Sequence, residues 1–103
     1  MAQITVVYWR DIPAQVLAGK GRRAAKVQLS PRFEQAIDRA AMRAGASGTD
    51  AYLADWRKVA EGERTGADDE AAAARAAELE AEWTPDRLRD VALAGGIETR
   101  GAA

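Results

Sequence analysis

The sequence predicts an α+β domain, with a small N-terminal antiparallel sheet of about three strands packed by three to four C-terminal helices. The first thirty residues alternate β-favouring side chains around a glycine-rich turn. The remainder shows helical periodicity and helix-start signals such as Ser30-Pro31 and Thr84-Pro85. A length of 103 residues suits one small domain. We therefore predict a single domain at residues 1–96 and a flexible tail at 97–103.

The strands are expected in two segments. The first is residues 3–10, where both alternating sets of side chains are largely apolar: Ile4, Val6 and Tyr8 on one side, and Thr5, Val7 and Trp9 on the other. This pattern is typical of a central strand that is covered on both faces. The second segment is a β-hairpin at residues 14–29. Its turn is predicted at Gly19-Lys20-Gly21, where glycine tolerates a positive φ.

Four helices are expected after the hairpin, at residues 31–44, 49–61, 68–82 and 85–94. Ser30 is expected to cap the first helix, and Gly45 to close it. The second helix begins at a capping box, Ser47 to Asp50, and its inner stripe is Tyr52, Leu53, Trp56, Val59 and Ala60. Helix 68–82 is rich in alanine and carries few large apolar side chains. We therefore expect it to pack weakly or to project into solvent.

Hydrophobic residues make up 48% of the chain, but many of them are alanine, which buries little area. The core therefore depends on a few larger side chains. The expected core residues are Ile4, Val6, Tyr8, Val16, Val27, Leu29, Phe33, Ile37, Tyr52, Leu53, Trp56, Leu88 and Val91.

The chain has no cysteine and no histidine, which excludes several classes of chemistry. Disulfides, thiolate nucleophiles, zinc-finger sites and histidine general bases are all impossible. A magnesium site made of carboxylates alone remains open, but no compact Asp/Glu cluster favours one. We assign no catalytic residue, no metal and no cofactor. The chain also lacks a signal-peptide pattern and a long apolar run, so we expect a cytoplasmic protein without a membrane association.

Charge is distributed unevenly although the net charge is only −1. Residues 1–45 carry eight Lys/Arg and three Asp/Glu, a balance of +5, whereas residues 46–103 carry seven and thirteen, a balance of −6. The two halves are expected to attract each other, within one molecule or between copies. A solvated basic face is the simpler interpretation of the first half.

Trp9-Arg10-Asp11, at the end of the first strand, is the first candidate site. In a functional interpretation, Trp9 stacks on a ligand or partner, Arg10 binds an anion and Asp11 accepts a proton or holds a cation. An enzyme with Asp11 and Tyr8 in acid/base roles is a further hypothesis. The structural interpretation makes Trp9 a core aromatic and Arg10-Asp11 a polar turn. No second acid or base is visibly paired with Asp11, which favours the structural interpretation.

The basic turn is the second candidate site. Its cations, Lys20, Arg22 and Arg23, stand among glycines whose backbone amides can surround a phosphate. The spacing is not that of a P-loop, and an exposed hairpin turn is the simpler interpretation. With Lys26 and Arg32 nearby, the turn is also a candidate contact for nucleic acid or for an acidic protein surface. Nucleic acid is the less favoured of these, because few aromatic residues are interspersed.

The segment Val6-Val7-Tyr8-Trp9-Arg10-Asp11-Ile12-Pro13-Ala14-Gln15-Val16, with Phe33–Met42 and Asp50-Ala51-Tyr52-Leu53, resembles a family of small bacterial proteins. The family is known as virulence factor or conserved virulence factor domains, and the resemblance covers about residues 3–60. It implies an interaction module without a known reaction. It also implies an accessory partner of folate- and corrinoid-dependent one-carbon enzymes, because stand-alone members are encoded beside them.

The sequence therefore predicts a non-enzymatic accessory or adaptor protein that presents Trp9-Arg10-Asp11 and the basic turn to another protein. The alternative is a module that binds an anion, a nucleotide or nucleic acid through Arg10, Lys20, Arg22 and Arg23.

Overall fold

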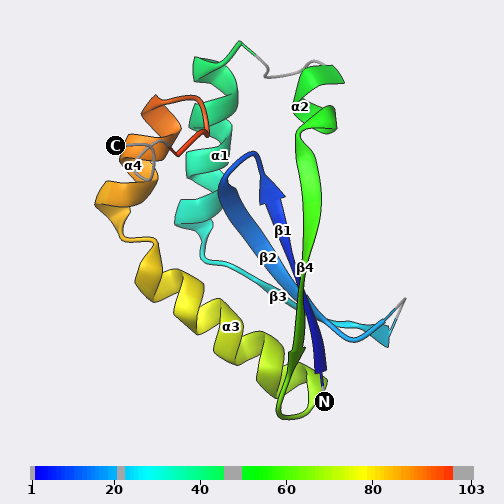
Figure 1. Ribbon diagram of the computed structural model, residues 1–103. Helices are drawn as coiled ribbons and strands as arrows, with labels where there is room; N and C mark the ends of the chain where they lie inside the picture. The colour runs from blue at the N-terminus through cyan, green and yellow to red at the C-terminus, as the bar shows by residue number, and fades with distance from the viewer. Residues whose placement is uncertain (1, 21–22, 46–49, 99–103) are drawn as a thin grey trace.

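A computed structural model describes residues 2–20, 23–45 and 50–98 of the chain. Strands come first and helices dominate the second half, as Figure 1 shows along the colour gradient. The elements, in chain order, are β1 (Ala2–Trp9), β2 (Ile12–Ala18), β3 (Ala25–Gln28), α1 (Pro31–Arg43), α2 (Asp50–Ala54), β4 (Trp56–Arg64), α3 (Asp68–Glu82) and α4 (Pro85–Leu93). The predicted α+β class is confirmed.

The sheet has four strands in the order β3-β2-β1-β4, and every neighbouring pair is antiparallel. β1 is central, as its two apolar faces predicted, and β2 and β3 form the expected hairpin. The prediction of about three strands is one short, because residues 56–64 form β4 along the free edge of β1.

The helix expected at residues 49–61 is wrong beyond its first turn. Only α2 is helical, and the chain becomes extended at Trp56. Strand pairing explains the difference, because without β4 one whole edge of β1 would keep its backbone N–H and C=O groups unpaired beside the core. Long-range strand pairing therefore overrides the local helical spacing.

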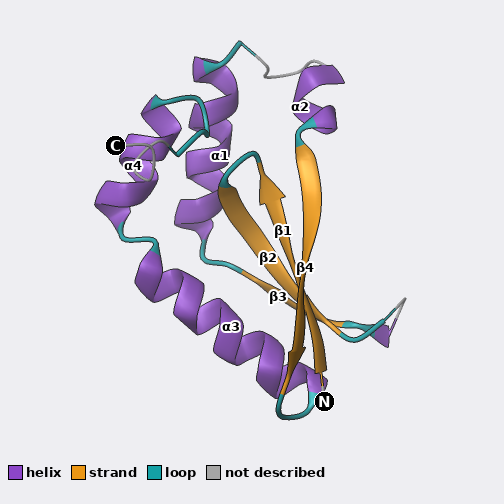
Figure 2. Ribbon diagram, in the orientation of Figure 1, coloured by secondary structure: helices purple, strands orange, loops and turns teal. Residues whose placement is uncertain are grey.

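One face of the sheet is buried beneath α3. Ile4 and Val6 of β1 and Val16 and Ala18 of β2 share this face and are all buried. α3 contacts β1, β2 and β3, with a buried side made of Ala71, Ala72, Ala76 and Leu79. The expectation that this helix projects into solvent is wrong, because small alanines let it lie close to the strands (Figure 2).

α1 packs on α4 and on β2. Thr84 caps α4 as predicted, since its hydroxyl accepts a hydrogen bond from Arg87 N at 3.2 Å. Ser30 makes no side-chain cap to α1. Its hydroxyl instead donates to Glu80 Oε1 at 2.9 Å, and its N–H donates to Glu80 Oε2 at 2.7 Å. The start of α1 is therefore tied to α3.

Most of the predicted core is confirmed. Ile4, Val6, Val16, Leu29, Phe33, Ile37, Leu88 and Val91 are buried, and Tyr8, Val27, Tyr52 and Trp56 are partly buried against them. Leu53 is the exception, because it is 67% exposed on α2. The core also contains Trp9, as its structural interpretation predicted, and three large side chains that were not predicted for it: Ile12, Leu79 and Trp83.

Candidate functional site

The indole of Trp9 lies in the core with an exposed fraction of 0%. Its ring centroid is 5.7 Å from that of Tyr52, and Nε1 donates a hydrogen bond of 2.8 Å to the Tyr52 carbonyl. The structural interpretation of Trp9 is therefore the correct one. The expectation that its side chain faces a partner is wrong, because the ring is covered on all sides.

Arg10 holds the β1–β2 turn against two distant segments. Its Nε is 2.8 Å from Asp55 Oδ2, and its Nη1 donates to the Gly95 carbonyl at 2.9 Å. The guanidinium also lies 4.9 Å from the centre of the Trp9 ring. Arg10 has a φ of 53°, an uncommon value for a residue with a side chain. Its hydrogen bonds stabilise this conformation, so the guanidinium is committed within the fold.

Asp11 extends this arrangement to the segment after α4. Its Oδ2 accepts a hydrogen bond of 2.7 Å from Glu98 N, and its Oδ1 is 3.4 Å from Arg57 Nη2. Glu98 was expected in a flexible tail, but the structure ties it to Asp11 and Arg87. The remaining tail residues, 99–103, lie outside the described residues. Trp9-Arg10-Asp11 therefore has a structural role: it joins the β1–β2 turn to Asp55 and to the segment after α4.

Tyr8 and Asp11 both line an open groove of about 490 Å³ between β4, α3 and the start of α4. Arg57 lies 5.1 Å above the Tyr8 ring. Burial, and to a smaller extent the carboxylate of Glu61, raises the pKa of the Tyr8 phenol above its ordinary value. The phenol therefore holds its proton at neutral pH, which disfavours a general-base role.

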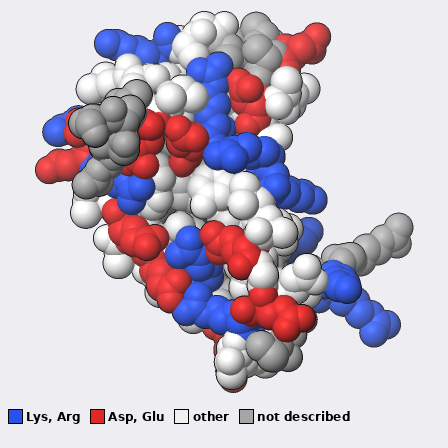
Figure 3. Space-filling model, in the orientation of Figure 1, with Lys and Arg blue, Asp and Glu red and all other residues white. Residues whose placement is uncertain are grey.

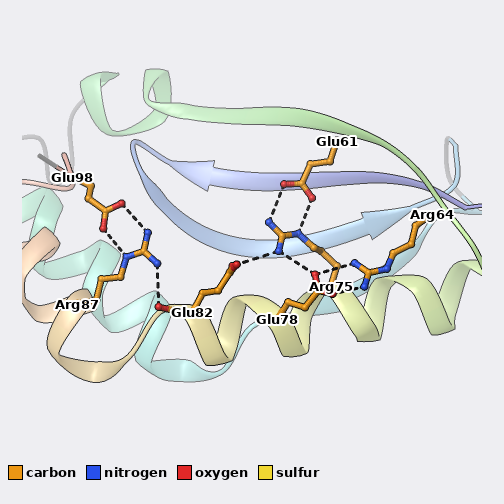
Figure 4. Close-up of polar contacts among 7 residues, drawn as sticks. All are labelled: Glu61, Arg64, Arg75, Glu78, Glu82, Arg87 and Glu98. Atoms are coloured by element: carbon orange, nitrogen blue, oxygen red, sulfur yellow. Dashed lines mark hydrogen bonds and ion pairs between the residues drawn. The ribbon is translucent and has the colours of Figure 1, made fainter. Parts of the chain in front are cut away.

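Arg75 and Arg87 of this groove, and Arg64 at the end of β4, are paired with carboxylates, as Figure 4 shows. Arg75 bonds both Glu61 oxygens at 2.8 and 3.1 Å and approaches Glu78 at 3.3 Å. Arg64 bonds both oxygens of Glu78. Arg87 bonds Glu98 at 2.6 and 2.8 Å. The network joins β4 to α3, and α4 to the segment after it, so its charges serve the fold.

The Arg64–Glu78 pair predicts a pH dependence of stability. Hydrogen bonds and the charge of Arg64, with a smaller contribution from Arg75, lower the pKa of Glu78 from 4.5 to about 2. The folded state therefore binds fewer protons than the unfolded state between these values, and stability falls as pH drops through this window. The free energy of unfolding, measured with urea from pH 7 to pH 2, should depend less steeply on pH in Glu78→Gln than in the wild type. Glu63→Gln removes a carboxylate that has no ion pair to another described residue, so it should keep the wild-type pH dependence. Equal slopes in the two variants would contradict the assignment.

The basic turn projects from the sheet between β2 and β3. Lys20 and Arg23 are exposed, as is Lys26 on β3, while Arg22 lies outside the described residues. Among the described residues, Lys20, Arg23 and Lys26 form no ion pair with a carboxylate. Figure 3 shows basic side chains around this hairpin. Arg32 does not join them, because it bonds the Trp83 carbonyl and Glu80.

The middle of the sheet face opposite α3, which we call the open sheet face, is made of two cross-strand rows. The strand register aligns Lys26, Leu17, Thr5 and Ala60 in one row, and Gln28, Gln15, Val7 and Lys58 in the next. The central positions are half-buried and those on the outer strands are exposed. Val7 and Leu17 therefore form an apolar centre, with Lys26 and Lys58 at opposite edges.

Sequence reasoning did not single out Val7, Leu17 or Lys58 as functional residues. The signal that points to them is the apolar character of both alternating sets in β1. This pattern predicted that both faces of the strand are buried. In the structure, Ile4 and Val6 on one face are buried, whereas Thr5 and Val7 on the other face are only half-buried.

The fold and this geometry define a small α+β protein with a basic hairpin and with a sheet face whose apolar centre is partly exposed. Residues 7–91 match the family model described as Virulence factor. The chain belongs to the virulence factor family. No match was found among the curated proteins or among the solved structures.

Two further findings concern metals and membranes. No group of three or more acidic side chains within residues 2–20, 23–45 and 50–98 is arranged to hold a metal ion. In the same ranges, no helix combines the length and the apolar character that crossing a bilayer requires.

Proposed function

We propose that this chain is a non-enzymatic, cytoplasmic accessory module that binds another protein through its open sheet face. One observation carries the proposal: Val7 and Leu17 form an apolar centre on the sheet face opposite α3, where both side chains stay partly exposed, while α1 and α2 lie beside one end of this face. The solvent face of an antiparallel sheet is ordinarily polar, so apolar side chains at its centre indicate a surface that a partner covers.

Charge indicates the chemistry of the partner. Lys26 and Lys58 stand at opposite edges of the open sheet face, and Lys20 and Arg23 extend the cationic surface along the hairpin. A partner with an acidic rim around an apolar centre complements this surface. The family resemblance supports a folate- or corrinoid-dependent one-carbon enzyme as that partner.

The proposal predicts that Leu17→Gln weakens partner binding about tenfold, since truncating a central interface side chain commonly costs more than 1 kcal/mol. The measurement is crosslinked affinity capture from the native cell, with quantitative mass spectrometry of each recovered protein. Leu53→Gln is the matched control, because it makes the same chemical change at an exposed leucine on α2. Thermal unfolding of both variants checks that the fold persists.

The proposal is contradicted if Leu17→Gln and Leu53→Gln recover the same proteins in the same yields. The identity of the partner is tested separately. A partner that depends on Leu17 but belongs to another class of protein removes the one-carbon assignment and leaves the binding surface in place.

The exposed cations of the hairpin support a second candidate, the binding of an anion or nucleic acid at Lys20 and Arg23. A single-stranded oligonucleotide and inorganic polyphosphate are the probes, titrated at low salt. Binding that falls with added salt, and is lost in a Lys20→Gln/Arg23→Gln double variant, supports this candidate. An absence of binding at low salt contradicts it.

A further inference from the structure

A groove runs between α1 and α4, away from the open sheet face. Its main hollow of about 380 Å³ is lined by Arg39, Met42 and Arg43 of α1 and by Arg89, Ala92 and Leu93 of α4. A second hollow of about 150 Å³ shares Arg39, Arg89 and Ala92 and continues toward the start of both helices. We call the two together the α1–α4 groove.

Apolar side chains are exposed in the α1–α4 groove. Met42 is 65% exposed and Leu93 is 53% exposed. They are two of the four large apolar residues that are exposed in the described parts of the chain, and both line the same hollow. Methionine adapts its shape to different apolar surfaces, and both methionine and arginine are enriched at protein interfaces.

Guanidinium groups surround these apolar side chains. Arg39 and Arg43 form no ion pair with another described residue, and Arg43 donates a hydrogen bond of 3.2 Å to the Leu93 carbonyl. Arg89 lies 3.5 Å from Asp90 and 3.7 Å from Asp86, but all three side chains are well exposed. Exposed pairs of this kind are weak, so Arg89 exchanges them readily for a partner's carboxylate.

The spacing of the lining residues indicates the shape of the occupant. The α1 residues are Arg32, Gln35, Ala36, Arg39, Met42 and Arg43, and the α4 residues are Pro85, Leu88, Arg89, Ala92 and Leu93. The α4 set follows a helical i, i+3, i+4, i+7, i+8 spacing, and the α1 residues lie along one side of their helix. The groove therefore runs along α4 for about 12 Å at a rise of about 1.5 Å per residue. A third helix lying in such a groove is a common mode of peptide recognition.

We propose that the α1–α4 groove binds an acidic amphipathic helix of a partner protein. The apolar side of that helix covers Met42, Ala92 and Leu93, and its flanking carboxylates pair with Arg39, Arg43 and Arg89. Arginine suits this role because its planar guanidinium forms two parallel hydrogen bonds with one carboxylate. The proposal rests on different residues from those of the open sheet face, so either can fail alone.

The test uses the full chain and a designed helical peptide of about 14 residues, enough to exceed the length of the groove. Leucines occupy one side of the peptide and glutamates flank them, and a scrambled peptide of the same composition is the reference. Fluorescence anisotropy should show at least tenfold tighter binding of the amphipathic peptide. This preference should weaken about tenfold in Leu93→Gln and in an Arg39→Gln/Arg43→Gln double variant.

Leu53→Gln is the matched control, because it makes the same change at an exposed leucine outside the groove and outside the open sheet face. The proposal is overturned if the chain fails to discriminate between the two peptides or if the groove variants bind like this control. It is also overturned if sedimentation shows that the wild-type chain self-associates and that Leu93→Gln abolishes this, because a second copy then occupies the groove.

Discussion

Replacing Trp9 with alanine is expected to lower the free energy of unfolding by about 3–5 kcal/mol, the usual cost of removing a large buried aromatic. The ring is fully buried, so truncation leaves a cavity between β1 and Tyr52. It also leaves the Tyr52 carbonyl without the Nε1 donor and removes the ring beside the Arg10 guanidinium. Since small domains are stable by only about 5–15 kcal/mol, much of the variant is expected to unfold.

Urea unfolding followed by circular dichroism measures this effect. Trp9→Phe separates its causes, because phenylalanine keeps an aromatic ring but loses the hydrogen bond and part of the volume. It should cost less than Trp9→Ala. A Trp9→Ala protein within about 1 kcal/mol of the wild type would contradict the core assignment, since that is far below the usual cost of such a truncation. A loss of binding in this variant reports unfolding and does not identify a contact.

The second large effect is expected at Gly96, which follows α4 and lies against the same ring. Its φ is +92°, and a Cβ added there would meet Trp9 Cζ3 at 2.9 Å and Arg10 Cδ at 3.3 Å. Gly96→Ala therefore combines backbone strain of about 1–3 kcal/mol with overpacking of about 1–3 kcal/mol. We expect the free energy of unfolding to fall by about 3 kcal/mol or more. The β1–β2 turn should also be less well fixed, because Asp11 N donates a hydrogen bond of 2.9 Å to the Gly96 carbonyl.

Gly62→Ala is the matched control for this prediction. Gly62 has almost the same φ, +95°, but a Cβ added there meets no atom within 4 Å. The two variants share the backbone strain, so the difference between their urea midpoints isolates the contact with Trp9. Equal destabilisation by Gly96→Ala and Gly62→Ala would show that this contact contributes nothing.

Local signals in the sequence were sufficient for much of the fold. The end of α1 at Gly45 and the cap of α4 at Thr84 follow from glycine and hydroxyl chemistry that acts within one turn. The β2–β3 hairpin likewise follows from its alternation and its glycines. These features need no partner elsewhere in the chain, which is why periodicity and composition are enough to predict them.

The candidate site was predicted less well, because the same residue type serves a core or a surface. Trp9 and Trp56 are paired on neighbouring strands, yet only Trp9 is fully buried. Arg10 and Asp11 were candidates for a ligand, but Asp55, Gly95 and Glu98 occupy them. Those partners lie 45 to 87 positions away, and no local pattern records such contacts.

By itself, the sequence determined the α+β class, the central position of β1, the hairpin, most of the helix ends and the absence of cysteine and histidine chemistry. Only the tertiary structure decided that residues 56–64 form a strand, that Trp9 is internal and that one apolar-centred sheet face stays open. The physical reason is the range of the interactions. Turns and caps are decided within a few residues, whereas strand pairing and burial depend on which distant segment fills each edge and face.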